Sequence, residues 1–346
     1  MSAVSRVGGV LAAVGAVAVG AAIGAAAEAA LVRRTVRPAP ILGFGSLRGQ
    51  PATVVADDGT PLYAEVDEAP PGVDDLTVVM CHGYGLNLGS WHYQRAMLRQ
   101  QARLVLWDQR SHGRSGRGPV PSIDRLGADL SSVIDVLVPE GPILLLGHSM
   151  GGMSAMALAA ARPELFGTRI RGVGLIATAA RGVGEARLGL PTPMAKALHR
   201  VAPGALGILA RSPDLVEAGR RSGSDLGLLL TRAYSFGSDV HPDATRFVSD
   251  MIAGTPIDVV ADFLPALQGH DKTQALTALD RTEVLVLVGT ADLLTPVARS
   301  EEIVRLVPHA EYVVVESAGH MVILEKQEQV NEHLLGLLQR VRATDG

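Results

Sequence analysis

The chain has 346 residues, of which 47% are hydrophobic and 19% are charged, and its formal net charge is −4 at pH 7. This composition supplies a large core, excludes a globally disordered chain and gives no basic footprint for binding nucleic acid. Cys81 is the single cysteine, so the sequence excludes a disulfide within the chain and a zinc site built from thiolates.

The first forty residues differ in composition from the rest of the chain. Residues 7–32 form an apolar run, rich in alanine and glycine, whose single charge is Glu28, and arginines follow the run closely. The run is long enough to cross a bilayer as a helix. We therefore interpret residues 1–40 as an apolar segment and a linker. The sequence allows three interpretations of this segment, namely a membrane anchor, an export signal and a soluble alanine-rich helix.

Strand-like and helix-like segments alternate after this region. The continuous apolar runs are typical of strands that are buried on both faces, and the first strand pair has a hairpin signal at Asp58-Gly59. Helical patterns lie between these runs, for example at 88–101 and 122–137. The alternation predicts an α/β fold with a mainly parallel central sheet and helices on both faces. The expected strands lie at 52–66 (as the hairpin), 76–83, 103–108, 143–149, 172–179, 283–290 and 311–317.

The alternation stops between about residues 181 and 280. This stretch is rich in leucine and alanine, is interrupted by prolines and contains no convincing buried strand. We interpret it as a helical cap inserted between two strands of the sheet. Ligands in open α/β sheets bind at the carboxyl ends of the strands, so a cap that leaves from such an end would cover the site. The predicted organisation is 1–40 N-terminal segment, 41–180 first part of the core, 181–280 helical cap and 281–346 second part of the core.

The sequence Gly-His-Ser-Met-Gly-Gly connects an apolar strand to an alanine-rich helix. A nucleophilic serine on a sharp strand-to-helix turn has strained backbone. Side chains two residues away on either side would crowd it, hence glycine at Gly147 and Gly151. A structural turn with a serine near the helix N-terminus is the alternative. Because the strand and the helix that the motif requires are both present, we interpret Ser149 as a nucleophile.

A serine hydroxyl needs a base, and the base needs an orienting partner. His320 follows the last predicted strand, and Asp292 follows the strand before it. Both residues therefore lie at the carboxyl ends of strands, at the same edge of the sheet as Ser149. A turn-forming role for Asp292 and an exposed position at a helix start for His320 are the structural alternatives. The matched positions favour a Ser-His-Asp triad.

The segment Cys-His-Gly-Tyr-Gly follows the first long buried strand. It would place the backbone N–H of Tyr84 near the nucleophile, and the N–H of Met150 would be a second donor. Two such donors can stabilise an oxyanion. We interpret the neighbouring His82 and His148 as structural. We expect the loop 108–115 to hold the edge of the site through hydrogen bonds without supplying a base.

Several segments together resemble the α/β-hydrolase fold superfamily. They are HGYG (82–85), DQRSHGRS (108–115), GHSMGG (147–152), GTADLLTP (289–296) and SAGHMVILEKQEQV (317–330). The resemblance covers about residues 50–180 and 280–342. Within the superfamily the chain is similar to bacterial serine esterases, lipases and monoacylglycerol-lipase-like enzymes. Epoxide hydrolases and haloalkane dehalogenases use an aspartate where this chain has Ser149, which excludes both.

The resemblance implies hydrolysis of carboxylic esters through an acyl-enzyme, with no metal or organic cofactor. The leucine, alanine and methionine content of residues 181–280 predicts that the small-molecule substrate carries an apolar or lipid-like acyl group. Ser149, His320 and Asp292 would form the catalytic triad. Other serine-triad activities stay open, namely those of thioesterases, carbon–carbon bond hydrolases, cofactor-free haloperoxidases and aminopeptidases. A slow-turnover ligand receptor and a tethered scaffold with a vestigial site are the non-enzymatic alternatives. Turnover of a short-chain p-nitrophenyl ester separates an enzyme from a receptor.

We predict that residues 7–32 anchor the protein in a membrane, with the hydrolase domain on the cytoplasmic side. Arg33, Arg34 and Arg37 follow the apolar run, whereas Arg6 alone precedes it, and basic flanks tend to stay in the cytoplasm. Fractionation of a C-terminally tagged protein, with protease added to intact spheroplasts, measures both properties. Recovery in the soluble fraction would exclude the anchor. Digestion of the tagged domain from outside would favour the alternative of an exported or cell-envelope protein.

Overall fold

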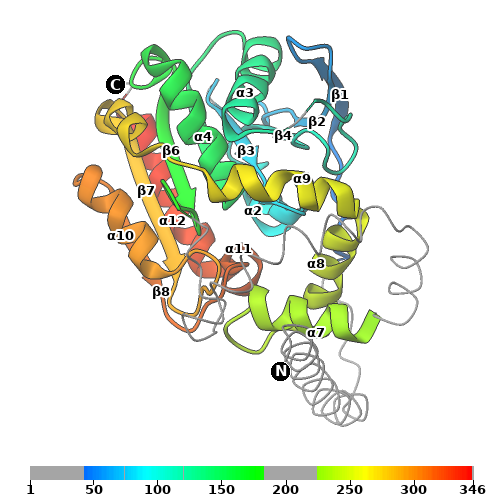
Figure 1. The fold of residues 1–346 in the computed structure, drawn as a ribbon. Coiled ribbons are helices and arrows are strands. Elements are labelled where there is room, and N and C mark those ends of the chain that lie inside the picture. The colour runs from blue at the N-terminus through cyan, green and yellow to red at the C-terminus, as the bar shows by residue number, and fades with distance from the viewer. Residues whose placement is uncertain (1–42, 74, 120, 183–223, 345–346) are drawn as a thin grey trace, which may run out of the picture.

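The computed structural model describes residues 43–73, 75–119, 121–182 and 224–344. Its centre is an eight-stranded sheet in the order β1-β2-β4-β3-β5-β6-β7-β8 (Figure 1). β2 runs antiparallel to β1 and β4, and the other neighbouring pairs are parallel, which confirms the predicted mainly parallel sheet. The strands are β1 (Gln50–Val55), β2 (Pro61–Asp67), β3 (Thr77–Cys81), β4 (Arg103–Trp107), β5 (Ile143–His148), β6 (Ile170–Ile176), β7 (Glu283–Gly289) and β8 (Glu311–Val315).

The hairpin between β1 and β2 turns where the sequence predicts it. Gly59 has a φ of 82°, a conformation that glycine adopts without steric cost, and its N–H donates to the carbonyl of Ala56 at 2.9 Å. Asp58 stabilises the same turn by accepting a hydrogen bond from the N–H of Thr60 at 3.1 Å. The Asp-Gly signal is therefore confirmed as the hairpin turn.

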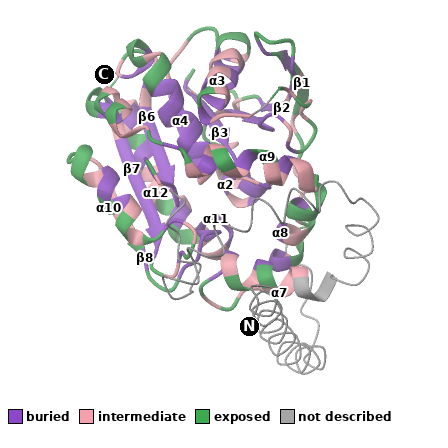
Figure 2. Ribbon diagram, viewed as in Figure 1, coloured by how far each residue is buried: buried purple, intermediate pink, exposed green. Residues whose placement is uncertain are grey.

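Helices cover both faces of the sheet (Figure 1). Successive side chains of a strand point to opposite faces, so Leu145 of β5 lies in one core and Leu144 and Leu146 lie in the other. This arrangement explains the unbroken apolar runs, and Figure 2 shows the central strands buried along their length. The first face is covered by α3 (Ile123–Leu137), α4 (Met150–Ala161), η2 (Pro163–Leu165), η4 (Thr273–Arg281) and α10 (Val297–Leu306), and the second by η1 (Leu88–Trp91), α2 (His92–Leu98), α11 (Val322–Glu325) and α12 (Gln327–Ala343).

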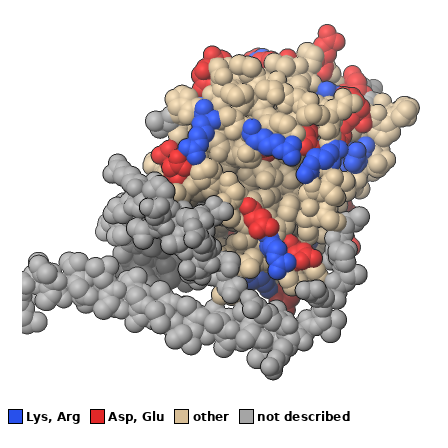
Figure 3. All heavy atoms as spheres, turned by 90° about the vertical axis from the view of Figure 1, so that its right-hand side faces the viewer, with Lys and Arg blue, Asp and Glu red and all other residues tan. Residues whose placement is uncertain are grey.

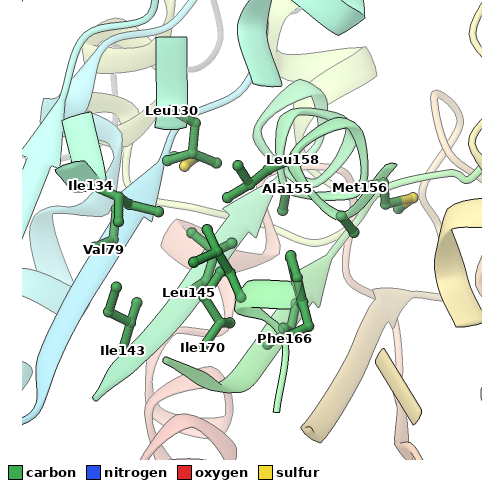
Figure 4. Close-up of a cluster of buried hydrophobic side chains, with 14 of the residues drawn as sticks. Val79, Leu130, Ile134, Ile143, Leu145, Ala155, Met156, Leu158, Phe166 and Ile170 are labelled. Carbon is green, nitrogen blue, oxygen red and sulfur yellow. The ribbon is translucent and has the colours of Figure 1, made fainter. Parts of the chain in front are cut away.

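The core around β5 holds helix α4 in place (Figure 4). Leu145 of β5 and Ala155 of α4 belong to the same buried cluster. α3 and α4 approach so closely that a Cβ at Gly127 in α3 would lie 2.7 Å from the Cβ of Ala157. Small residues on both helices permit this contact. The consequence is that α4, and with it the turn that precedes Met150, has a fixed position over the sheet.

The described part of the predicted cap is helical. It contains α7 (Ser224–Ser235), α8 (Pro242–Gly254) and α9 (Ile257–Gln268). The insertion leaves after β6 and returns beside the same point, because Arg181 and Asp271 form an isolated antiparallel bridge. Residues 183–223, which include much of the apolar stretch expected over the site, lie outside the described residues. The boundaries at 40/41, 180/181 and 280/281 stay predictions.

The predicted anchor at residues 7–32 also lies outside the described residues. In the ranges that the structure does describe, no helix is both long enough and apolar enough to cross a membrane. On the face shown in Figure 3, basic and acidic side chains are interspersed over a largely uncharged surface.

A buried ion pair joins the loop after β4 to helix α3. Nε and Nη2 of Arg110 donate to the two carboxylate oxygens of Asp129 at 2.5 and 2.6 Å, and both side chains are fully buried. Nη1 of the same guanidinium donates to Asp58 at 2.9 Å. In the same loop, Asp108 accepts hydrogen bonds from the N–H groups of Leu88 and Arg114, each at 2.8 Å. These contacts hold the loop in place and connect it to the segment after β3.

We expect Asp129→Asn to lower the free energy of unfolding by about 3–5 kcal/mol, because it leaves the charge of Arg110 buried without its main partner. Asp124→Asn in the first turn of the same helix is the matched control. Its side chain is 74% exposed and its ion pair with Lys272 lies at the surface, so we expect a loss below about 1 kcal/mol. Urea denaturation of both variants measures the difference, and equal losses would contradict the interpretation.

Candidate active site

Ser149 lies on the sharp turn between β5 and α4. Its backbone has φ 53° and ψ −120°, a region that residues other than glycine rarely adopt and that costs about 1–3 kcal/mol. Hydrogen bonds on both sides stabilise it. The N–H of Ser149 donates to the carbonyl of Ile176 at 2.9 Å, and its carbonyl accepts from the hydroxyl of Thr178 at 2.7 Å. The backbone is thus held in a conformation that presents the serine side chain at the end of the strand.

The flanking glycines are required by packing of the backbone around the turn. A Cβ at Gly147 would lie 2.5 Å from the backbone nitrogen of Gly152, in the first turn of α4. A Cβ at Gly151 would lie 2.1 Å from the carbonyl oxygen of Cys81, at the end of β3. The predicted reason was crowding of the serine by its neighbours. The structure gives a different reason, which is the close approach of α4 to β5 and β3.

The structure brings Ser149, His320 and Asp292 together from three separate loops. His320 Nε2 lies 2.9 Å from Ser149 Oγ, and His320 Nδ1 lies 2.9 Å from Asp292 Oδ2. An ionised carboxylate only accepts hydrogen bonds, so Nδ1 carries the imidazole proton and Nε2 is free to accept from the serine hydroxyl. The arrangement can therefore transfer a proton from Ser149 to His320.

The carboxylate of Asp292 is buried and fully hydrogen-bonded. The N–H groups of Leu294 and Thr295 donate to Oδ1 at 2.8 Å each, and the Thr295 hydroxyl donates to Oδ2 at 2.7 Å. Burial alone raises the pKa of Asp292, but the charge of His320 and these hydrogen bonds outweigh it, so the pKa lies below its ordinary value. Asp292 thus forms the turn that the structural alternative proposed and also pairs with His320.

The amides of Tyr84 and Met150 lie on the two segments that meet at Ser149. A Cβ at Gly83, the residue before Tyr84, would lie 3.2 Å from the Cβ of Ser149, and Met150 is the first residue of α4. Among the described residues, neither amide has a protein acceptor. N–H groups at a helix N-terminus favour negative charge. An anion beside Ser149 Oγ could therefore be stabilised at this point.

His82 supports the segment that carries Tyr84. The N–H of Gln109 donates to His82 Nε2 at 2.9 Å, so His82 Nδ1 carries the proton and donates to the carbonyl of Gly83 at 2.7 Å. That carbonyl and the N–H of Tyr84 belong to one peptide group, so this bond orients the amide. Burial and the neighbouring His112 lower the pKa of His82 to about 3, which keeps the ring neutral.

His148 contacts the backbone of His320. Its Nε2 lies 2.9 Å from the carbonyl oxygen of His320, and the contact requires an N–H on that nitrogen. Burial and the charge of His320 lower the pKa of His148 to about 3, so this ring is also neutral. Both histidines beside the motifs thus bind backbone carbonyls, in keeping with a structural role.

A cavity of about 330 Å³ lies between the core and the cap. β2, the loops after β3 and β4, and α8 line it, with Asn87, Asp108 and Met251 among the contributing residues, whereas Ser149 does not line it. Within the described ranges, no group of three or more histidine, cysteine, aspartate or glutamate side chains is arranged to hold a metal ion.

Comparison with known proteins identifies similar sequences in bacteria. The chain is 27% identical over 281 residues to the dihydrolipoyllysine-residue acetyltransferase component of the acetoin cleaving system of Pseudomonas putida, a match that covers 78% of this chain and 65% of that protein. The chain thus spans less than two thirds of that protein's length. It is 26% identical to 3-oxoadipate enol-lactonase 2 of Acinetobacter baylyi, with 83% of this chain and 96% of that protein covered.

A solved structure of an esterase has a similar fold. The thermophilic esterase from Thermogutta terrifontis superposes with a TM-score of 0.62 at 26% sequence identity, and the match covers 85% of this chain and 99% of that one. The family model described as "Alpha/beta hydrolase family" matches residues 78–333, which is more than half of the chain. With this match and the observed sheet order, the chain belongs to the alpha/beta hydrolase family.

Proposed function

We propose that the chain is a serine hydrolase that cleaves carboxylic esters through an acyl-enzyme. Ser149 is the nucleophile, His320 the general base and Asp292 the residue that orients the base. The observation that carries the proposal is the continuous contact from Ser149 Oγ through His320 to Asp292, with both distances at 2.9 Å. The relatives named as an enol-lactonase and an esterase support an ester as substrate.

In the first half of the reaction, Ser149 Oγ attacks the carbonyl carbon of the ester while His320 Nε2 takes the hydroxyl proton. The carbonyl oxygen gains negative charge, and the N–H groups of Tyr84 and Met150 donate to it. The intermediate then expels the alcohol, which receives the proton from His320. In the second half, His320 takes a proton from water, and the resulting hydroxide attacks the acyl carbon. The intermediate then expels Ser149 Oγ, which takes the proton back from His320, and the acid leaves.

Asp292 makes this proton transfer favourable. His320 becomes positively charged in each half of the reaction, and the ionised carboxylate at 2.9 Å stabilises that charge. Both groups are buried, so their attraction is stronger than it would be in water. The lowered pKa of Asp292 keeps the carboxylate charged, because its ionised form persists to lower pH than that of a free aspartate.

We also propose that the acyl group is apolar. Met150 and Met153, at the start of α4, belong to one buried cluster with Val259 and Phe263 of the cap helix α9. Apolar side chains of the cap thus belong to the same buried cluster as the residue whose N–H is assigned to the oxyanion. Hydrolysis rates across a series of p-nitrophenyl esters of increasing chain length, with thioesters and amides beside them, test both the substrate class and the leaving group. A preference for charged acyl groups would contradict the proposal.

We expect Ser149→Ala to abolish ester hydrolysis and labelling by a fluorophosphonate, because the variant lacks the nucleophile, and His320→Ala to be nearly as damaging. Asp292→Asn should lower kcat by about 10⁴-fold, because the amide cannot hold the imidazole in the required tautomer. Asp280→Asn, an exposed substitution of the same kind, is the control and should retain activity. Near-full activity in Asp292→Asn would show that another residue orients the base.

We expect Tyr84→Phe to keep kcat within about fivefold of the wild type, because only the backbone N–H is assigned to catalysis. The hydroxyl of Tyr84 instead donates to the carbonyl of Val260 in α9 at 2.5 Å. Its removal should therefore lower the thermal stability of the protein by weakening the contact with the cap. Kinetics with p-nitrophenyl butyrate and a thermal melt measure the two effects. A loss of about 10²–10³ in kcat, typical of a missing oxyanion donor, would assign the hydroxyl a direct role.

A further inference from the structure

The carboxylate of Glu325 lies between the cap and the loop that carries His320. Oε2 accepts a hydrogen bond from the N–H of Gly319 at 2.6 Å. Oε1 accepts from the hydroxyl of Ser238 at 2.7 Å and from the N–H of Gly237 at 3.0 Å, and the N–H of Ser238 also donates to it. Gly319 precedes His320, whereas Gly237 and Ser238 form part of the connection between α7 and α8. One carboxylate thus joins the two segments.

The backbone around His320 is held from two further directions. The N–H of Met321 donates to the carbonyl of Ser235, the last residue of α7, at 2.7 Å. The carbonyl of His320 accepts from His148, at the end of β5, at 2.9 Å. The three consecutive residues 319–321 thus form hydrogen bonds to three different elements, namely α11, β5 and α7. The cap supplies one of these bonds directly and is tied to another through Glu325.

Close packing leaves little room for these segments to slide past one another. A Cβ at Gly319 would lie 2.7 Å from the backbone nitrogen of Gly237. A Cβ at Gly237 would lie 2.6 Å from the Cβ of Ala291, the residue before Asp292. The connection between α7 and α8 therefore touches both the loop of the base and the loop of the acid. A shift of this connection would move both residues relative to Ser149.

We propose that Glu325 is a positioning residue that ties the cap to His320 and thereby keeps His320 Nε2 within hydrogen-bond distance of Ser149 Oγ. The inference rests on the proposed function and assigns Glu325 no contact with substrate. The N–H groups of Gly319, Gly237 and Ser238 and the Ser238 hydroxyl all donate to the carboxylate. An amide keeps only one acceptor oxygen, so its N–H groups would face donors on the other side. A displacement of about 1 Å in a reacting group can cost about 10²-fold in rate, so a small change at Glu325 would be amplified in catalysis.

The test compares Glu325→Gln with Glu328→Gln, an identical change at an exposed residue in the first turn of α12. With p-nitrophenyl butyrate as substrate, we expect Glu325→Gln to lower kcat by about 10- to 100-fold with little change in KM. We also expect the low-field proton resonance of His320 Nδ1–H to shift or broaden, because the bond to Asp292 is no longer held in one geometry. Glu328→Gln should leave both readouts at the wild-type values.

Ser238→Ala provides a milder variant, since it removes only the hydroxyl donor from Glu325. We expect about a 3- to 10-fold loss in kcat and a smaller change in the same resonance. If Glu325→Gln does not give the circular dichroism spectrum of the folded wild type, Ser238→Ala alone tests the positioning role of Glu325. A loss that is confined to KM or to thermal stability in both variants would overturn the positioning role, because it would describe an anchor of the cap and nothing more.

The same assay separates this inference from the proposed function. An active wild type and an inactive Ser149→Ala variant support the serine hydrolase. A second outcome concerns Glu325 alone. If the wild type is active, Ser149→Ala is inactive, and the Glu325 and Ser238 variants match Glu328→Gln in kcat and in the His320 resonance, the positioning role of Glu325 is overturned. If the wild type hydrolyses no ester, or if Ser149→Ala retains activity, the proposed function is overturned, and the inference that rests on it is overturned as well.

Discussion

The contact between the first turn of α4 and the end of β3 is the constraint on which the candidate site depends. A side chain at Gly151 would collide with the carbonyl of Cys81, so only glycine lets the helix begin there. This approach determines where Ser149 lies, and it brings the segment after β3 against the serine. Hydrogen bonds to the N–H and the carbonyl of Ser149 hold its backbone in the strained conformation.

His320 and Asp292, the proposed base and its orienting partner, lie close together because parallel strands end at one edge of the sheet. Asp292 follows β7 and His320 follows β8, and neither strand is a neighbour of β5. Loops must therefore carry these two residues back across β6. Hydrogen bonds from Thr295 hold Asp292, and hydrogen bonds to Glu325, His148 and the cap hold the backbone around His320. The geometry at Ser149 therefore depends on residues outside the proposed triad.

Burial favours the neutral form of every titratable group in this region, and the neighbours of each group decide whether it stays neutral. His82 and His148 have acceptors or donors but no charged partner, so burial lowers the pKa of each ring and keeps it neutral. Asp292 is also buried, and burial favours its neutral form. Its neighbours are hydrogen-bond donors and the positive charge of His320, which lower its pKa, so the carboxylate stays charged. The same low-dielectric surroundings thus provide neutral supports for the backbone and one stable negative charge for the proposed base.

The sequence by itself determined the α/β architecture, the hairpin at Asp58-Gly59 and the turn at Ser149, because each depends on a local pattern. Continuous apolar runs specify buried strands, and glycine specifies a turn that other residues cannot form. It also predicted that Asp292 and His320 follow strands at the serine's edge of the sheet, because their positions at strand ends are visible along the chain. Only tertiary structure decided that they approach within 2.9 Å of their partners.

The supports of the site were invisible in the sequence, since their partners are distant along the chain. Glu325 is 88 residues from Gly237, and no periodic pattern connects a glutamate in a short helix with the connection between two cap helices. The reason for Gly151 also came from tertiary contact, because the group that excludes a side chain there is the carbonyl of Cys81 on another strand. Local patterns predict elements, whereas hydrogen bonds between separate elements depend on how those elements pack together.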